Sequence, residues 1–275
     1  LGVTRGIGNA VNILMPVLFV LLLMLLWYAY KNGEFMRGLT FMFSADFSKL
    51  TGQSVLTAMG HAFFTLSLGM GTIMVYGSYM PENQSIPGAS VTVAFLDTLI
   101  ALIAGMAIFP LVFASGLEPG SGPGLLFETL PIAFSDMWGG AFFGTGFFVL
   151  VSIAALSSSI SLIEPGIAWL EKLGITRIAA TVGLALLCWI GGVASIFSSE
   201  VFDMLDFITA NIMLPLGGLL IAIFVGWKLG YTRVRKEVTG VNNGLFNVWF
   251  VVLRFITPIG VIAVFYESLK GLFTG

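Results

Sequence analysis

Long apolar stretches separated by short polar segments make up most of the sequence. Each of seven stretches is long enough to cross the hydrocarbon core of a bilayer, which needs about 20 helical residues. They are 9–31, 54–80, 88–115, 139–171, 176–196, 203–229 and 244–272. The pattern predicts an all-α membrane protein with one transmembrane domain over residues 1–275. The stretches 139–171 and 203–229 are long enough to tilt or to project from the bilayer.

The second stretch carries small and polar residues at its centre: Thr65, Ser67, Gly69 and Gly71. Its surplus length and its glycines predict two half-helices joined by unwound residues. Bare backbone N–H and C=O groups at membrane depth occur where they line a cavity or bind an ion, so 64–71 is predicted to be part of a binding site. The alternative is an unbroken helix whose small residues allow a neighbouring helix to approach closely.

Charged residues are scarce, at 9% of the 275 residues, as expected for a chain that lies mostly in lipid. Lys and Arg are more frequent in the loops on one side, and the strongest single signal is a predicted loop at 228–237 with four basic residues and one Glu. We expect a multi-pass protein of the cell inner (plasma) membrane. Its orientation follows from the charge bias, because cytoplasmic loops carry the excess of Lys and Arg. Its N-terminus is predicted to be cytoplasmic and its C-terminus outside. The absence of a basic patch with interleaved aromatic residues argues against a nucleic acid partner.

Polar side chains inside the stretches are the next candidates for function. Asp97 lies well inside the third stretch, where a carboxyl group is either protonated and bonded to a neighbour or ionised beside a cation. Ser157, Ser158 and Ser161 share one helical face and could form an oxygen cage for a hard cation. Their hydroxyls could equally bond back to preceding carbonyls. Pro165 frees the carbonyl of Ser161 from its helical hydrogen bond.

Other polar residues give weaker signals. His61 precedes Thr65 by one helical turn, and a single membrane His is more typical of a hydrogen-bonded packing residue than of a ligand. Asp203 and Asp206 lie at the outer end of the sixth stretch, where an acid can reach water. The single Cys188 allows no disulfide within the chain. The sequence shows no pair of nucleophile and base and no phosphate-binding or dinucleotide-binding motif, so an enzyme is not expected.

Two interhelical segments and one proline complete the pattern. We expect the polar segment 32–53 to be an ordered loop on the outer surface. Turn residues begin the segment 116–138, and its later apolar part predicts a hairpin or short helix, with a surface loop as the alternative. Pro16 lies about one turn inside the first stretch, where it predicts either a static kink or a segment that unwinds readily.

Five separate motifs resemble the neurotransmitter:sodium symporter family, whose bacterial members have the leucine-transporter fold. They are Gly60 to Tyr79, Gly6 with nine residues before Pro16, Gly122-Pro123-Gly124, Leu156-Ser157-Ser158-Ser159, and Arg254-Phe255-Ile256-Thr257-Pro258. The resemblance runs over essentially the whole chain. It implies the C-terminal seven-helix portion of an eleven-helix transporter, with a broken second span. The first four helices would then belong to the same protein or to a second chain.

The resemblance also implies two sodium sites, each only partly supplied by this chain. Thr65 and Asp97 correspond to part of the first site. The carbonyl of Ala154 and the side chains of Ser157 and Ser158 correspond to part of the second. Because these residues do not complete either site, the chain by itself is expected to be inactive.

Substrate-binding and gating residues follow from the same resemblance. Phe64 is similar to the aromatic residue that covers the substrate, and Asp206 to the acid of the outer gate, whose Arg partner belongs to the first helix. Tyr79 resembles an inner-gate residue, and Gly6 to Pro16 the segment that unwinds on inward opening. The residues expected to contact the substrate are Phe64, Thr65, Ser67, Met70, Ser158 and Leu162.

Three positions depart from the family pattern. Many members have Asn at the position of Asp97, and the carboxylate here could replace the charge that chloride supplies in chloride-dependent members, so we predict chloride independence. Many members have Gln at the position of His61, which could couple a proton or act as a neutral hydrogen-bond partner. Many have Phe at the position of Met70, and the adaptable Met side chain would suit a large or varied hydrophobic substrate.

The function implied by the resemblance is sodium-coupled symport of an amino acid, expected to be hydrophobic, by alternating access. A membrane protein that keeps this fold for binding or regulation without transport is the first alternative. The presence of Thr65, Asp97, Ser157 and Ser158 at positions that correspond to sodium ligands argues against it. An ion channel is the second alternative, and the absence of a repeated pore-filter motif argues against that.

Overall fold

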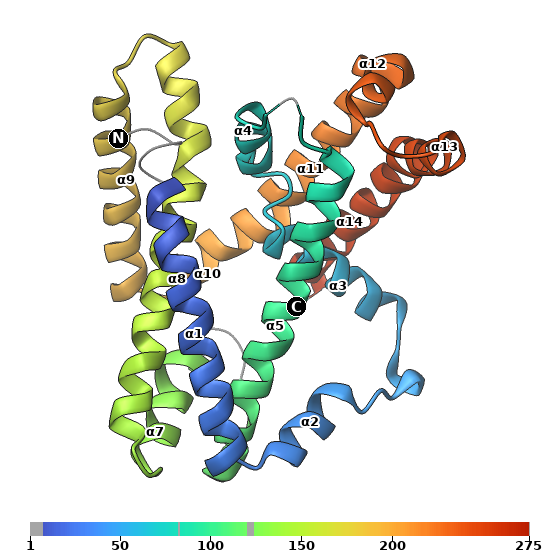
Figure 1. The fold of residues 1–275 in the computed structure, drawn as a ribbon. Helices are drawn as coiled ribbons and strands as arrows, with labels where there is room; N and C mark the ends of the chain where they lie inside the picture. Colours follow the sequence, from blue (N-terminus) through green and yellow to red (C-terminus); the bar gives the residue numbers. More distant parts are fainter. Residues whose placement is uncertain (1–7, 82, 120–123, 275) are drawn as a thin grey trace. The chain divides into compact units, whose positions relative to one another are not determined.

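The computed structural model describes residues 8–81, 83–119 and 124–274, and the regular structure within them is helical (Figure 1). Contacts along the chain define two compact units. The first contains Leu1–Phe47 and Leu96–Ile160, and the second contains Ser48–Phe95 and Ser161–Gly275. The single transmembrane domain expected from the sequence stays a prediction.

Among the described residues, six helices are long and apolar enough to cross a membrane. They are Asn12–Asn32 within α1 (Gly8–Asn32), α5 (Ile86–Ala114), α8 (Gly140–Lys172), α9 (Arg177–Phe197), the helix Ser199–Glu237, and Asn243–Tyr266. These helices correspond to six of the seven predicted stretches. The second stretch is divided between two shorter helices, α3 (Gly52–Thr65) and α4 (Thr72–Ser78), as its central glycines predicted.

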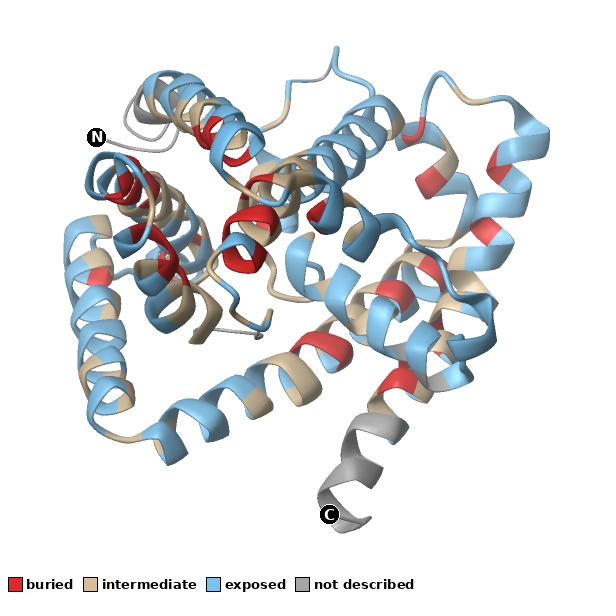
Figure 2. Cartoon of the chain, turned by 90° about the horizontal axis from the view of Figure 1, so that it is seen from below, coloured by how far each residue is buried: buried red, intermediate tan, exposed pale blue. Residues whose placement is uncertain are grey.

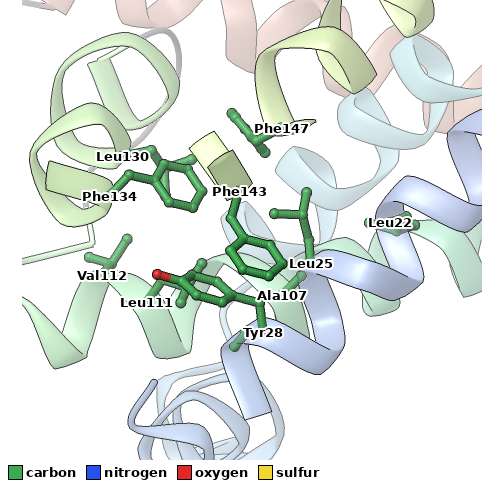
Figure 3. Close-up of a cluster of buried hydrophobic side chains, with 11 residues drawn as sticks. Leu22, Leu25, Tyr28, Ala107, Leu111, Val112, Leu130, Phe134, Phe143 and Phe147 are labelled. Carbon is green, nitrogen blue, oxygen red and sulfur yellow. The ribbon is translucent and has the colours of Figure 1, made fainter. Parts of the chain in front are cut away.

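The core of the first unit forms where α1, α5, α7 (Leu130–Ser135) and α8 meet (Figure 3). Tyr28 is fully buried and stacks on Phe143, with 3.9 Å between the ring centroids. Its hydroxyl group donates a hydrogen bond of 2.8 Å to the carbonyl of Trp138. Gly140 begins α8 at a point where a Cβ atom would overlap the carbonyl of Phe134, so glycine allows α7 and α8 to approach this closely.

Two segments between the long apolar stretches, 32–53 and 116–138, are helical in part. The segment 32–53 contains α2 (Phe35–Phe43) and a 3₁₀ turn at Phe47–Lys49. The amide of Glu34 donates to the carbonyl of Pro110, and Arg37 lies over the ring of Phe113. Prediction of a loop was therefore wrong for α2, because contacts with α5 order a segment that is polar overall. The described part of 116–138 contains the predicted short helix, formed by a π-helical turn at Leu125–Thr129 and α7.

The second unit contains α3, α4, the C-terminal part of α8, and the helices that follow it. The helix Ser199–Glu237 is built from α10 (Ser199–Phe207), a π-helical turn at Ile208–Met213, α11 (Leu214–Ile223), a second π-helical turn at Phe224–Leu229 and α12 (Gly230–Glu237). The last helix comprises α13 (Asn243–Val251), a π-helical turn at Val252–Ile256 and α14 (Thr257–Thr274). α11 and α14 pack on α3.

The loop predicted at 228–237 is helical up to Glu237, so that prediction was wrong. Val234 and Val238 are buried against Phe246 and hold the polar segment on α13. The Arg235 guanidinium donates to the carbonyl of Val238 at 2.6 Å, which orders the turn that follows. The basic residues therefore do not mark the end of the helix, which is instead stabilised by packing beyond the apolar stretch.

Most residues of the long helices are exposed in this chain (Figure 2). On α9, for example, Ile178, Leu187 and Trp189 are exposed. Large apolar side chains exposed over whole helices are typical of surfaces that lipid or neighbouring transmembrane helices cover. Pro16 lies within α1, and the backbone is helical on both sides of it. Gly6, Gly122 and Pro123 fall outside the described residues.

Candidate functional site

The chain leaves the helical conformation between α3 and α4, at Leu66–Gly71 (Figure 1). The amide of Leu68 donates to the carbonyl of Phe63 at 2.9 Å, and the amide of Ser67 donates to that of Phe64 at 3.1 Å. These two bonds form the Schellman arrangement that ends a helix and saturates its last carbonyls. Ser67 has a φ of 53°, a left-handed conformation that favours glycine, so the break includes local backbone strain.

Most backbone carbonyl oxygens along the break, Leu66–Gly71, accept no helical hydrogen bond. Gly69 and Gly71 also have positive φ angles, 87° and 82°, which turn the chain between the two half-helices. Among the described residues, no backbone amide donates a hydrogen bond to a carbonyl between Thr65 and Met70. Carbonyls released from helical bonding at membrane depth can bind a cation or an ammonium group. The predicted break is therefore confirmed, and the competing prediction of an unbroken helix is excluded.

Two glycines of α11 allow it to contact the break directly. A Cβ atom on Gly217 would overlap the carbonyl oxygen of Gly69, and a Cβ atom on Gly218 would overlap the ring of Phe63. A Cβ atom on Gly69 would in turn overlap the carbonyl oxygen of Leu214. Sequence reasoning did not identify these glycines, although a Gly-Gly pair inside an apolar stretch is a signal of close helix packing.

The second half-helix, α4, is fixed to the C-terminal part of α8. The Tyr76 hydroxyl group donates to the Ser161 hydroxyl oxygen at 3.1 Å. A Cβ atom on Gly71 would lie 3.6 Å from the Pro165 side chain, so the start of α4 lies in van der Waals distance of the proline. Thr72, the first residue of α4, is buried. Polar and apolar contacts with α8 thus hold α4 in place after the break.

The residues predicted for the second sodium site lie on one turn of α8 in the first unit. The Ser157 hydroxyl group donates to the carbonyl oxygen of Ala154, and the two oxygens lie 2.8 Å apart. This is the back-bonding that the sequence offered as the alternative, and it also brings two predicted ligand oxygens together. Ser158 is exposed on the same turn. Their role as ligands stays a prediction.

The remaining predicted residues are placed on individual elements. In the second unit, Phe64 and Thr65 are exposed at the end of α3, and Ser67 and Met70 are half-buried in the break. Asp97 is half-buried on α5, in the first unit. The other predicted residues that are exposed are His61 on α3, Leu162 on α8, Asp203 and Asp206 on α10 and Tyr79 at the end of α4.

Tyr79 borders an open groove of about 480 Å³ between α4 and α8. Met74 and Ser78 line it from α4, and Glu171 and Lys172 line it from α8. The groove lies entirely within the second unit. The predicted inner-gate residue therefore lies at a surface depression with charged side chains on one wall, next to the end of the half-helix that follows the break.

An ion pair between a buried carboxylate and a partly exposed arginine in the second unit was not predicted from the sequence. Glu164 is fully buried on α8, and both of its carboxylate oxygens accept hydrogen bonds of 2.8 Å from Nη2 of Arg177. Nη1 of Arg177 donates to the carboxylate of Glu171 at 2.9 Å. This arrangement joins the end of α8 to the start of α9. The signal available in the sequence was Glu164 inside an apolar stretch, followed by Arg177 just after the connection to the next stretch.

Comparison with known proteins identifies the family to which this chain belongs. The model of the sodium:neurotransmitter symporter family matches residues 1–273, so the chain belongs to that family. The crystal structure of MhsT in complex with L-phenylalanine matches 97% of the chain and 64% of MhsT, with a TM-score of 0.87 and 42% identity. The predicted family and the predicted all-α, leucine-transporter-type fold are confirmed.

Two curated bacterial relatives are similar over nearly the whole chain. The uncharacterized sodium-dependent transporter YhdH of Bacillus subtilis is 36% identical over 98% of the chain and 63% of the relative. An uncharacterized sodium-dependent transporter of Haemophilus influenzae is also 36% identical, over 98% of the chain and 62% of the relative. The chain thus spans about three fifths of the length of these relatives. Both are named as transporters rather than enzymes.

Proposed function

We propose that the protein carrying this sequence is a sodium-coupled symporter of a hydrophobic amino acid. The single observation that carries the proposal is the non-helical segment Leu66–Gly71, which leaves backbone oxygens free of helical bonding in the middle of the apolar stretch 54–80. Membership of the family and the names of the two bacterial relatives support sodium coupling. L-phenylalanine in the MhsT complex supports a hydrophobic substrate. Met70, half-buried in the break, offers an adaptable apolar contact.

The donor set proposed for sodium contains only oxygen. Thr65 and Asp97 contribute to the first site, and Ala154, Ser157 and Ser158 contribute to the second. Hydroxyl, carbonyl and carboxylate oxygens are the ligands that hard cations prefer. The 2.8 Å approach of the Ala154 and Ser157 oxygens is compatible with two ligands of one ion. The rest of each site is expected to come from other parts of the transporter, within the same protein or on a second chain.

The substrate is proposed to bind at the break itself. Its ammonium group meets the carbonyls near Phe64, Thr65 and Ser67, which are not used in helical hydrogen bonds. Phe64 covers the bound amino acid, and Met70 contacts its side chain. The residues proposed to complete this chain's part of the pocket are Ser158 and Leu162.

Alternating access is proposed to occur around the break. Asp206 belongs to the outer gate and Tyr79 to the inner gate, while the segment Gly6 to Pro16 unwinds when the inner side opens. The strained Ser67 and the two glycines at positive φ favour the break as the point where α3 and α4 change their mutual angle. The orientation with a cytoplasmic N-terminus stays part of the proposal, since it rests on the distribution of Lys and Arg.

Binding of radiolabelled L-phenylalanine to the complete purified protein tests this function. We expect binding in sodium chloride and at least tenfold weaker binding when choline replaces sodium. Uptake into proteoliposomes with an inward sodium gradient separates a transporter from a binding protein of the same fold. Sodium-dependent binding without uptake would favour the non-transporting alternative, and flux at channel rates would favour a channel.

Chloride independence is a separate prediction that depends on Asp97. Uptake by the wild-type protein is expected to be unchanged when gluconate replaces chloride, because the carboxylate already supplies negative charge beside the first sodium. Asp97→Asn removes that charge and is expected to lower apparent sodium affinity about tenfold or more, an effect of the size of one lost charged partner. A large loss of wild-type uptake in chloride-free buffer would refute the prediction.

A further inference from the structure

Arg254 is a cation within a membrane-spanning helix, Asn243–Tyr266. Its guanidinium carbon lies 5.6 Å from the ring centroid of Trp227 and 5.5 Å from that of Phe255. Its Nε is buried without a hydrogen-bond partner, and no carboxylate within the described ranges forms an ion pair with it. Because an unpaired charge in a membrane is costly, this guanidinium favours an anion from outside these residues.

The backbone around Arg254 is shaped for close contact with the preceding helix. A Cβ atom on Gly226 would lie 3.2 Å from the Arg254 Cα, which is tighter than an ordinary contact. Both residues lie in π-helical turns, Gly226 within Phe224–Leu229 and Arg254 within Val252–Ile256. π-helical turns in α-helices are frequent at functional sites. Packing of the backbone therefore fixes the Cα atom of Arg254 next to Gly226, and from there the side chain reaches the ring of Trp227.

The distribution of charge along the neighbouring helix indicates the depth of this site. Between Asp206 and Lys228 lie the 21 residues 207–227, none of which is charged. At 1.5 Å per residue they span about 32 Å, close to the thickness of the hydrocarbon core. Trp227 and Lys228 then lie at the boundary between hydrocarbon and headgroups, where Trp is enriched. Arg254 packs against Trp227 and lies at the same depth.

The surroundings of this boundary are basic. Lys228, Arg233 and Lys236 are exposed, and Glu237 is the one acid among residues 228–237. Arg235 differs from them, because its guanidinium donates to the carbonyls of Val238 and Val241 and is already satisfied. Phosphate is the anion found at headgroup depth, and guanidinium groups bind it with charge-assisted hydrogen bonds.

We propose that Arg254, Lys228 and Trp227 form a binding site for the phosphate of an anionic phospholipid. The lipid belongs to the leaflet at which α12 ends, which the Lys and Arg distribution predicts to be the cytoplasmic one. The Arg254 guanidinium and the Lys228 ammonium group hold the phosphate. The rings of Trp227 and Phe255 contact the glycerol and the upper part of the acyl chains. The site is separate from the break between α3 and α4.

Native mass spectrometry of the complete protein, titrated with phosphatidylglycerol or phosphatidylcholine, tests this site. The wild-type protein is expected to bind phosphatidylglycerol more tightly. Arg254→Gln and Lys228→Gln are each expected to weaken phosphatidylglycerol binding about fivefold, the typical effect of one basic residue near an anionic surface. Neither substitution is expected to change phosphatidylcholine binding. Arg37→Gln is the matched control, since Arg37 pairs with Glu34 on the first unit, and it is expected to leave both affinities unchanged.

Wild-type phosphatidylglycerol affinity in both Arg254→Gln and Lys228→Gln would overturn the proposal. If Arg254→Gln does not fold, the exposed Lys228 still provides the test, and unchanged affinity in Lys228→Gln alone would then overturn it. Excess inorganic phosphate is expected to leave phosphatidylglycerol bound, because it cannot make the contacts of the acyl chains. Full displacement by inorganic phosphate would overturn the assignment to a lipid.

Discussion

Gly217→Ala is expected to reduce sodium-dependent amino acid binding tenfold or more. The added Cβ atom would overlap the carbonyl oxygen of Gly69, a backbone atom that cannot turn aside as the end of a flexible side chain could. Overpacking at such a contact costs about 1–3 kcal/mol, and the break must move to relieve it. Because the proposed substrate contacts are backbone oxygens of the break, displacement acts directly on binding. Radiolabelled L-phenylalanine binding over a sodium titration measures the effect.

The matched control is Gly183→Ala in the middle of α9, where a Cβ atom would meet nothing within 4 Å. This substitution is expected to leave binding at the wild-type level, and helix propensity favours it slightly. Wild-type sodium dependence in Gly217→Ala would show that close contact between α11 and the break is not needed for binding.

Glu164→Gln is expected to have the largest effect on stability. It leaves the Arg177 guanidinium without the buried carboxylate that accepts two hydrogen bonds of 2.8 Å. Loss of hydrogen bonds to a charged, buried acceptor costs about 1.5–3 kcal/mol, and Arg177, whose side chain is 31% exposed, keeps its bond to Glu171. A lower midpoint of thermal unfolding of the complete protein in detergent reports this loss.

The same arginine provides the control. Glu171 bonds to the other Nη atom of Arg177, but its side chain is 36% exposed, against 2% for Glu164. Glu171→Gln is therefore expected to cost less than about 1 kcal/mol, as is typical of exposed pairs. An equal loss of stability in Glu164→Gln and Glu171→Gln would contradict a larger contribution from the buried carboxylate.

The break could be predicted from sequence because its cause is local. Twenty-seven residues in the stretch 54–80 exceed the length of one span, and Gly69 and Gly71 allow the left-handed conformations that the structure shows. Ser67, just after the end of α3, adopts such a conformation too, and that could not be predicted, since residues other than glycine uncommonly have a positive φ.

Contacts between elements distant in sequence could not be predicted. Gly217 and Gly69 meet because α11 crosses the break, and nothing near either glycine in the sequence specifies the other. The pair of Glu164 and Arg177 depends likewise on the angle between α8 and α9. Hydrophobicity also misplaced one helix end. It located the edge of the apolar stretch near Leu229, whereas the helix continues to Glu237 on packing contacts.

The most direct test of the central claim is an experimental structure of the complete protein with sodium and L-phenylalanine. We expect the amino acid beside the backbone of Leu66–Gly71, with a sodium ion against Thr65 and with α3 and α4 still separated. An L-phenylalanine molecule bound elsewhere, or an unbroken helix from Phe63 through Gly71 in the bound state, would contradict it.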